Sequence, residues 1–234
     1  MKVVNNMVGK TPFCGTLEAC EKTSPCLFLD VDHGTLSLND VKPCPTIFTV
    51  TKWSDMQSIQ PLIKDKKWDK LADYVKAEPK EYRSVVIDSG TELANSVLLR
   101  SIVAEDDRNE GIPDQPAYLK SQVRFSIMWR SFRDLPITCI MTAGVKDQRD
   151  DVSGIVKLFP EFSPALLHDL QRHSDLILFM NVLQEKDGEK SRWIRSLQTQ
   201  PSSRFVARDR SGKLDPIIKG ERLYWKTLLD KIFA

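Results

Sequence analysis

The sequence lacks a hydrophobic run long enough to cross a membrane. Its longest apolar stretches, such as CLFLDV and DLILFMNVL, are far shorter than the ~20 residues that a transmembrane helix needs. The N-terminus also lacks the apolar core of a signal peptide. We therefore expect a cytoplasmic protein with no membrane partner.

Paired cysteines are missing as well. The five cysteines are odd in number and form no CxxC pair, so the sequence indicates neither a disulfide framework nor a zinc site. His168 and His173 have no cysteine or third histidine near them in the sequence. The expected state of the cysteines is reduced and mostly buried.

The chain also has little net charge. Its value of +2 over 234 residues does not indicate a nucleic-acid partner, so any such binding would need a local basic patch. The contents of 41% hydrophobic and 28% charged residues are ordinary for a globular protein. Since there is no repeat or long linker, we expect residues 1–234 to form a single domain.

What the sequence does contain is an alternation of strand and helix patterns. Strands are expected at 25–32, 46–50, 82–90 and 135–143, the first and last of them buried, and helices at 12–22, 54–74 with an interruption at Pro61, 92–104, 118–133 and 165–173. Residues 144–164 are expected to be irregular. Strands follow at 175–182, 192–199 and 204–209, of which the last two are expected to form an antiparallel edge, and about the last twenty residues are expected to be helical. This order predicts an α/β fold with a mostly parallel central sheet, helices on both faces and an antiparallel C-terminal edge.

The stretch NNMVGKT at residues 5–11 ends as a phosphate-binding loop ends. In the full pattern GxxxxGK[ST], backbone N–H groups surround a phosphate, the lysine reaches the phosphates and the Ser or Thr ligates Mg²⁺. The first glycine of this pattern is missing, because Val4 stands five places before Gly9. An ordinary solvated lysine in a loop is the alternative interpretation. The expected nucleotide-binding residues are Val8, Gly9, Lys10 and Thr11.

Two of the expected strands end in aspartates. Asp88 ends the run VVID, where it would hold Mg²⁺ opposite the Thr11 hydroxyl, although a simple strand end is the alternative. The earlier run ends in Asp30 and Asp32, which would share one face of a regular strand and point toward a bound nucleotide. Asp32 is nearer the strand tip and is the expected general base for an attacking water.

Four motifs occur in order along the chain: LFLDVDHGTLSL, VVIDSGTEL, ITCIMTAG and RSLQTQPSSRFVARDRSGKLD. Together they resemble the phage-encoded RecA-like P-loop ATPases, which are related to the RecA and RadA recombinases and to the replicative helicase core. The resemblance extends from Val4 to Asp215. It implies a RecA-like P-loop NTPase core, ATP and Mg²⁺ as cofactors, and a homo-oligomer, ring or filament, with nucleotide at the subunit interface.

The resemblance also implies roles for single residues. Asp88 matches the acid of the Mg²⁺ site, and Asp32 falls where relatives usually have a catalytic glutamate. Arg208 and Arg210 lie in a turn that resembles the one reaching the γ-phosphate of a neighbouring subunit, with a solvated basic turn as the alternative. Hydrolysis is expected to be slow or impaired, because the first loop glycine is missing, Asp32 is shorter than glutamate, and Gly144 replaces a frequent histidine.

In the resembled families, two loops hold single-stranded DNA. Their places here are 105–116, which is acidic and unsuited to phosphate, and 145–159. The second loop supplies the expected DNA-binding residues Lys146, Arg149 and Lys157. Ordinary solvated loops are the alternative.

The sequence thus predicts a phage-type, DNA-dependent RecA-like ATPase. It would assemble on single-stranded DNA and assist homologous recombination or strand annealing, with a single-strand-binding protein as a candidate partner. One alternative is a non-hydrolysing nucleotide- or DNA-binding scaffold in replication or recombination. The other is a helicase-like motor or loader.

Overall fold

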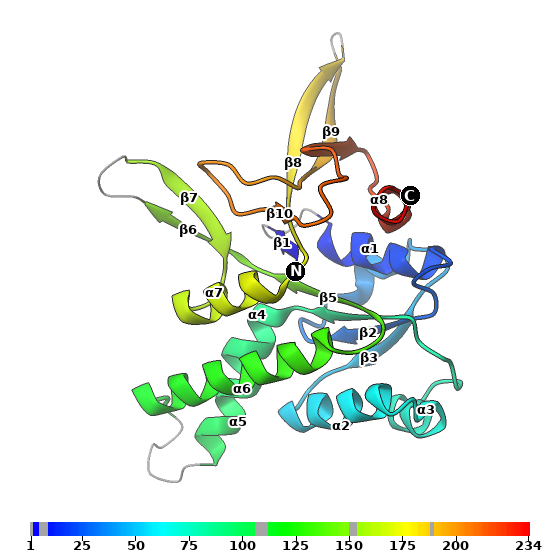
Figure 1. Cartoon of the computed structure of the whole chain (residues 1–234), viewed down its shortest axis with the longest axis vertical. Coiled ribbons are helices and arrows are strands. Elements are labelled where there is room, and N and C mark those ends of the chain that lie inside the picture. The colour runs from blue at the N-terminus through cyan, green and yellow to red at the C-terminus, as the bar shows by residue number, and fades with distance from the viewer. Residues whose placement is uncertain (1, 5–8, 106–111, 150–153, 188–189) are drawn as a thin grey trace.

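The structure is a computed structural model that describes residues 2–4, 9–105, 112–149, 154–187 and 190–234. A sheet forms its centre, in the strand order β11-β9-β8-β1-β5-β4-β2-β3, with β10 paired to β8 (Figure 1). Neighbouring strands from β8 to β3 in this order are parallel. The strands are β1 Lys2–Val4, β2 Cys26–Asp30, β3 Thr46–Thr49, β4 Ser84–Asp88, β5 Thr138–Ala143, β8 Leu176–Asp187, β9 Lys190–Gln198, β10 Arg208–Asp209 and β11 Ile217–Gly220.

The inner parallel strands are apolar on both faces, as expected for strands with helices on each side. In β2, Leu27 and Leu29 pack into one hydrophobic cluster, while Cys26 and Phe28 pack into a second one on the opposite face. All residues of β4 are buried. The four predicted strands are present as β2, β3, β4 and β5, although β3 is only partly buried.

Helices cover both faces of the sheet (Figure 1). The larger cluster includes side chains of α2, α3, η3, α5, α6 and α7, and the smaller one includes side chains of α1, η1, η2 and α8. The helical elements are α1 Lys10–Gly15, η1 Thr16–Ala19, η2 Thr35–Leu38, α2 Trp53–Lys64, α3 Trp68–Val75, α4 Gly90–Glu92, the π-helix η3 Leu93–Leu98, α5 Leu99–Ala104, α6 Gln115–Arg133, α7 Pro164–His173 and α8 Trp225–Ile232. The predicted α/β class, with a mostly parallel sheet between helices, is confirmed.

Two helix predictions need correction. The helix expected at 12–22 is shorter, because α1 ends at Gly15 and the tighter turn η1 ends at Ala19. The helix expected at 54–74 breaks later than Pro61, which lies inside α2. The break follows α2, where Lys66 has a positive φ of 53°. Among the described residues, no helix has both the length and the apolar character needed to span a membrane.

The antiparallel side of the sheet has different partners from those expected. Strand β9 pairs with β8 and with β11, whereas β10, expected to pair with β9, pairs with β8. The C-terminal segment is not helical throughout, since β11 precedes α8. Beyond the rest of the sheet, β8 and β9 continue as a two-stranded arm (Figure 1).

The segment 144–164, expected to be irregular, contains an antiparallel hairpin. Its strands are β6 Val145–Arg149 and β7 Val156–Pro160. The hairpin projects from the body of the molecule (Figure 1). Strand β6 reads VKDQR and strand β7 reads VKLFP, so neither shows the continuous apolar run of strands such as β2 and β4.

Candidate functional site

The site lies at the carboxyl ends of the parallel strands. Strands β1, β5 and β4 are parallel neighbours, so their carboxyl ends meet at one edge of the sheet. Gly9 precedes α1 and has a φ of 89°, a left-handed conformation that glycine adopts without steric cost. Its carbonyl oxygen accepts a hydrogen bond from the Phe13 N–H at 3.1 Å, so α1 begins directly after this residue.

Asp88 is the centre of a buried hydrogen-bond network. It is the last residue of β4 and only 2% exposed. Thr11 Oγ1 donates to Asp88 Oδ2 at 2.6 Å, and Thr142 Oγ1 donates to Oδ1. A buried carboxylate needs such partners, because its desolvation is otherwise costly. These bonds join the end of the predicted phosphate loop to the predicted acid.

The amine of Lys10 lies in the same place. Its Nζ donates to the Ala143 carbonyl oxygen at 3.4 Å, one residue beyond Thr142. The positive charge of Lys10 also acts on Asp32, where it partly offsets the increase in pKa that burial causes. The fold therefore brings Lys10 and Asp88 together, far apart though they are in the sequence. Val8 lies outside the described residues.

Asp32 lies at the site, but not as part of a regular strand, as had been expected. Strand β2 ends at Asp30, so Asp30 and Asp32 do not share a strand face. The N–H groups of Val31 and Asp32 donate to the Asp88 carbonyl oxygen at 2.6 and 3.2 Å. The Ser89 hydroxyl then donates to Asp32 Oδ1 at 2.8 Å.

The surroundings of Asp32 act on its proton affinity in both directions. Desolvation raises the pKa of its carboxyl above the usual range, and the Asp88 charge adds to this increase. The Ser89 hydrogen bond and the Lys10 charge partly offset it. A raised pKa makes the carboxylate a stronger base than an exposed aspartate.

The chemistry of this group of residues fits Mg²⁺. The ion prefers oxygen ligands and is usually held by one or two carboxylates together with substrate phosphates and waters. Asp88 and Thr11 supply a carboxylate and a hydroxyl within hydrogen-bond distance of each other. No group of three or more His, Cys, Asp or Glu suited to a metal occurs in the described part of the chain, so phosphate oxygens would have to complete the ligand set.

Comparison with known proteins agrees with this geometry. A family model described as "AAA domain" matches residues 5–211. The chain belongs to this AAA domain family. Its P-loop ATPase character is thereby supported. A search of curated proteins finds no match. Among solved structures, the chain is similar to the KaiC-like protein PH0186 from Pyrococcus horikoshii OT3, with 12% identity, a TM-score of 0.34, and coverage of 84% of this chain and 77% of that chain.

Two predicted arginines of the AAA domain lie away from this group. Arg208 pairs opposite Ile177 near the start of β8, and its Nη1 donates to the Gln171 carbonyl oxygen at 3.1 Å. Arg210 forms an ion pair with Asp175 at 2.9 Å. The start of β8 is the opposite end of the sheet from the Thr11 and Asp88 network. A role of these arginines at a phosphate would therefore require a second subunit.

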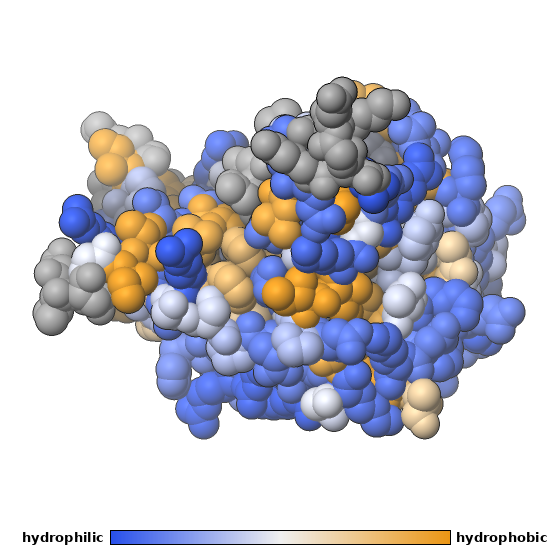
Figure 2. Space-filling view, turned by 90° about the horizontal axis from the view of Figure 1, so that it is seen from above, coloured by the Kyte–Doolittle hydropathy of each residue, from blue (hydrophilic) through white to orange (hydrophobic). Residues whose placement is uncertain are grey.

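The three predicted DNA-binding residues lie on the β6–β7 hairpin, but not on one face. Lys146 pairs opposite Phe159 and Arg149 opposite Val156, so Lys146 and Lys157 share a face and Arg149 lies on the other. Lys146 Nζ also donates to the Phe162 carbonyl oxygen. Lys157 lies over the Phe159 ring at 5.5 Å. Figure 2 shows hydrophobic surface on the side of the molecule where this hairpin projects.

Three residues of the site were not predicted. Thr142 and Ser89 directly contact the two predicted aspartates, and each is a polar residue at the end of an apolar run, which is a usable sequence signal. Arg195 of β9 gave no such signal. Its side chain lies against Gly9, since a Cβ built on Gly9 would be 2.8 Å from Arg195 Nε. This contact depends on a strand pairing far along the chain.

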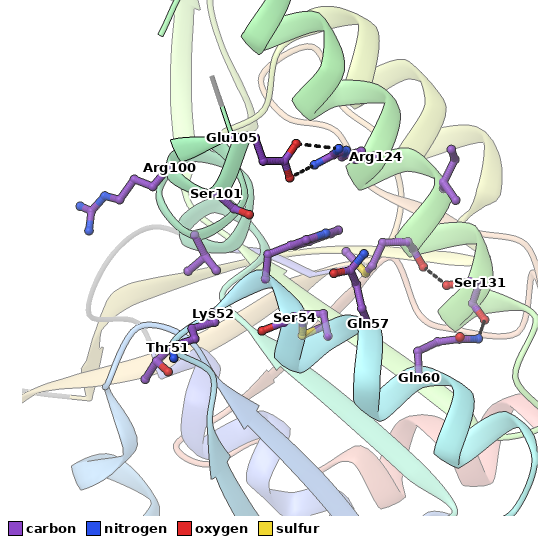
Figure 3. Close-up of a pocket in the computed structure, with 15 residues that line it drawn as sticks. Thr51, Lys52, Ser54, Gln57, Gln60, Arg100, Ser101, Glu105, Arg124 and Ser131 are labelled. Atoms are coloured by element: carbon purple, nitrogen blue, oxygen red, sulfur yellow. Dashed lines mark hydrogen bonds and ion pairs between the residues drawn. The ribbon is translucent and has the colours of Figure 1, made fainter. Parts of the chain in front are cut away.

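A cavity of about 850 Å³ lies in another part of the AAA domain, among α2, α5 and α6 (Figure 3). It includes none of the residues around Asp88. At its rim, Glu105 accepts hydrogen bonds from Arg124 at 2.8 and 3.0 Å. Arg124 and then Lys120 lower the pKa of Glu105 to about 2. Glu105, the first residue of the acidic segment 105–116, therefore keeps its negative charge, which Arg124 and Lys120 of helix α6 balance.

Proposed function

We propose that this AAA domain binds ATP with Mg²⁺ at Lys10, Thr11 and Asp88. The hydrogen bond of 2.6 Å between Thr11 Oγ1 and Asp88 Oδ2 carries the proposal, because it joins the two groups that the metal would need. Lys10, beside them, offers a positive charge to the phosphate oxygens. Mg²⁺ would supply charge neutralisation at the phosphates.

The same site supports slow hydrolysis. Asp32 is the proposed general base, and the Ser89 hydroxyl holds its carboxylate in place beside Asp88. Lys10 lies close enough to stabilise negative charge that develops on the phosphate. Arg208 and Arg210 would act on the nucleotide of a neighbouring subunit in a ring or filament, which suits their distance from the site of their own chain.

Substitution of Lys10 tests the proposal. We expect Lys10→Ala to weaken Mg²⁺-dependent ATP binding at least about tenfold, a change that corresponds to about 1.4 kcal/mol, because a charge-assisted contact to phosphate is lost. Calorimetric titration of wild type and variant measures this change. Lys70→Ala, at an exposed position of α3, is the matched control. Equal ATP affinity of Lys10→Ala and wild type would sink the proposal.

A non-hydrolysing scaffold is the second candidate function, and Gly144 favours it. No side chain extends from this position after β5, and a Cβ there would be 2.2 Å from a carboxylate oxygen of Glu161. The space that a γ-phosphate-sensing side chain would use is thus taken by Glu161. Phosphate release with and without single-stranded DNA separates the candidates: turnover lost in Asp32→Asn supports the enzyme, and wild type that binds ATP without turnover supports the scaffold.

We further propose that the AAA domain, of a phage-encoded type, assembles on single-stranded DNA and assists recombination or annealing. The support is the projecting β6–β7 hairpin, which carries Lys146 and Lys157 on the face of Phe159 and Arg149 on the opposite face. Cations and aromatic rings together suit a phosphate backbone with stacked bases. A single-strand-binding protein remains a proposed partner in the same process.

A further inference from the structure

A cavity of about 410 Å³ adjoins Gly9 on the face of the sheet covered by α1 and α8. Pro12 and Phe13 of α1 form one wall. Asp40, after η2, lines a second side. Arg195 of β9 also lines it, as do Arg222, Leu223 and Tyr224 between β11 and α8. The volume lies in the range of small-molecule sites, and Lys10, Thr11 and Asp88 do not line it.

The segment Glu221–Tyr224 is fixed over α1 from both ends. On one side, β11 pairs with β9, and Arg195 Nη1 donates to the Glu221 carbonyl oxygen at 2.6 Å. On the other side, the Trp225 N–H donates to Thr16 Oγ1 at 3.0 Å. The rings of Phe13 and Trp225 stack at 4.9 Å, with an interplanar angle of 18°.

Two exposed side chains of this segment, Arg222 and Tyr224, line the cavity. Tyr224 is an aromatic ring, 46% exposed, at the cavity wall. Arg222 and Arg195 supply planar cations, and Asp40 supplies an acceptor for a sugar hydroxyl or a base N–H. A flat heterocycle with an attached sugar satisfies all three, since rings stack on tyrosine and on guanidinium planes.

We infer that this cavity holds the nucleoside of the bound triphosphate, with Tyr224 and Arg222 as specificity-determining residues. The inference rests on the proposed function, because it places the phosphates at Lys10 and the nucleoside beyond Gly9. Arg222 and Tyr224 lie outside residues 5–211, which the family model matches. The C-terminal segment of this chain thus completes a site that the family-wide part begins.

Titration with two ligands tests the inference: ATP, and inorganic tripolyphosphate, each with Mg²⁺. Tripolyphosphate presents the phosphates without a nucleoside. We expect wild type to bind ATP more tightly than tripolyphosphate. Tyr224→Ala should weaken ATP binding about tenfold and leave tripolyphosphate binding within about twofold. Lys10→Ala should weaken the binding of both ligands. Tyr118 is a similarly exposed tyrosine on α6, and Tyr118→Ala should change the affinity for neither ligand.

Arg222→Ala is the second variant, because Arg222 is exposed and its loss leaves the contacts between α8 and α1 in place. Thermal unfolding shows that each variant is folded. The inference is overturned if both variants bind ATP as tightly as Tyr118→Ala does. It is also overturned if they lose affinity for ATP and for tripolyphosphate to the same extent. Equal wild-type affinity for the two ligands overturns this inference alone. A wild type that binds neither ligand overturns the proposed function along with it.

Discussion

Asp30 and Asp32 are two residues apart, yet their carboxyl groups have different surroundings. Asp30 is 3% exposed and accepts a hydrogen bond from the Gly34 N–H at 3.2 Å, whereas Asp32 lies beyond the strand end and contacts Ser89. The alternation of a regular strand predicted a shared face. It failed because the chain turns at Val31, where the Asp88 carbonyl oxygen of the neighbouring strand accepts both N–H groups. Alternation within one strand does not contain that information.

Asp30 gives a prediction about stability and pH. Burial raises the pKa of its carboxyl, and the Asp88 charge adds to the increase. Because the folded-state pKa lies above the unfolded one, protonated Asp30 favours the fold at low pH, and this contribution is lost as the pH rises through the folded-state pKa. We expect Asp30→Asn to increase the free energy of unfolding, relative to wild type, more at about pH 7 than at about pH 3.

Denaturant unfolding of both proteins across this pH range measures the difference. Asp73→Asn, at an exposed position of α3, serves as the control. The same difference between Asp30→Asn and wild type at both pH values would contradict the prediction.

Some residue contacts of the site were predictable and others were not. The GKT end of the loop and an aspartate at a strand tip carry recognisable chemistry, and the structure brings Thr11 and Asp88 into contact. The second partner of Asp88, Thr142, belongs to a strand whose position beside β4 becomes visible only in the fold. Arg195 depends on the pairing of β9, which is still further from any local pattern.

At the scale of elements, continuous apolar runs predicted strands reliably, whereas strands of mixed composition were missed. Strands β2 and β4 are buried throughout, so their sequences show their environment directly. Strands β6, β7 and β11 are short, partly exposed, and held by antiparallel partners. None of them shows a long apolar run, and the pairing that defines them is a property of two segments at once.

The docking of α8 is an element-scale feature that can be tested by truncation of one side chain. Trp225 is 4% exposed, stacks on Phe13 and fixes the start of α8 through its N–H. We expect Trp225→Ala to lower the free energy of unfolding by about 3–5 kcal/mol, because a large buried ring is replaced by a cavity. Chemical denaturation provides the measurement.

Phe233→Ala is the matched control, since Phe233 follows α8 and is 66% exposed. It should change stability by less than about 0.5 kcal/mol. If both variants lose the same stability, the packing of α8 on α1 is not the cause of the Trp225 effect.

At the scale of the whole molecule, the β6–β7 hairpin gives the prediction on DNA. Arg149→Ala and Lys157→Ala should each weaken single-stranded DNA binding similarly for different sequences, because phosphate contacts carry no sequence information. Each should also lower the magnitude of the salt dependence, the slope of log K against log salt, by about 0.7. Fluorescence anisotropy over a salt series measures both effects.

The opposite faces of the hairpin provide an internal comparison. Lys157 and Arg149 lie on different faces, so a strand that follows one face only should respond to one of the two variants. Lys70→Ala, on α3, is the control for loss of a surface cation. An unchanged salt slope in both hairpin variants would remove the hairpin from the DNA-binding surface.

The long arm formed by β8 and β9 also links distant parts of the molecule mechanically. Strand β9 carries Arg195, which rests on Gly9, and it continues outward into the arm. A paired two-stranded ribbon resists bending better than a single loop does. A displacement of the arm would therefore be transmitted along β9 to Arg195 and Gly9. A partner that binds the arm and displaces it would therefore also displace Arg195 relative to Gly9, without entering the site.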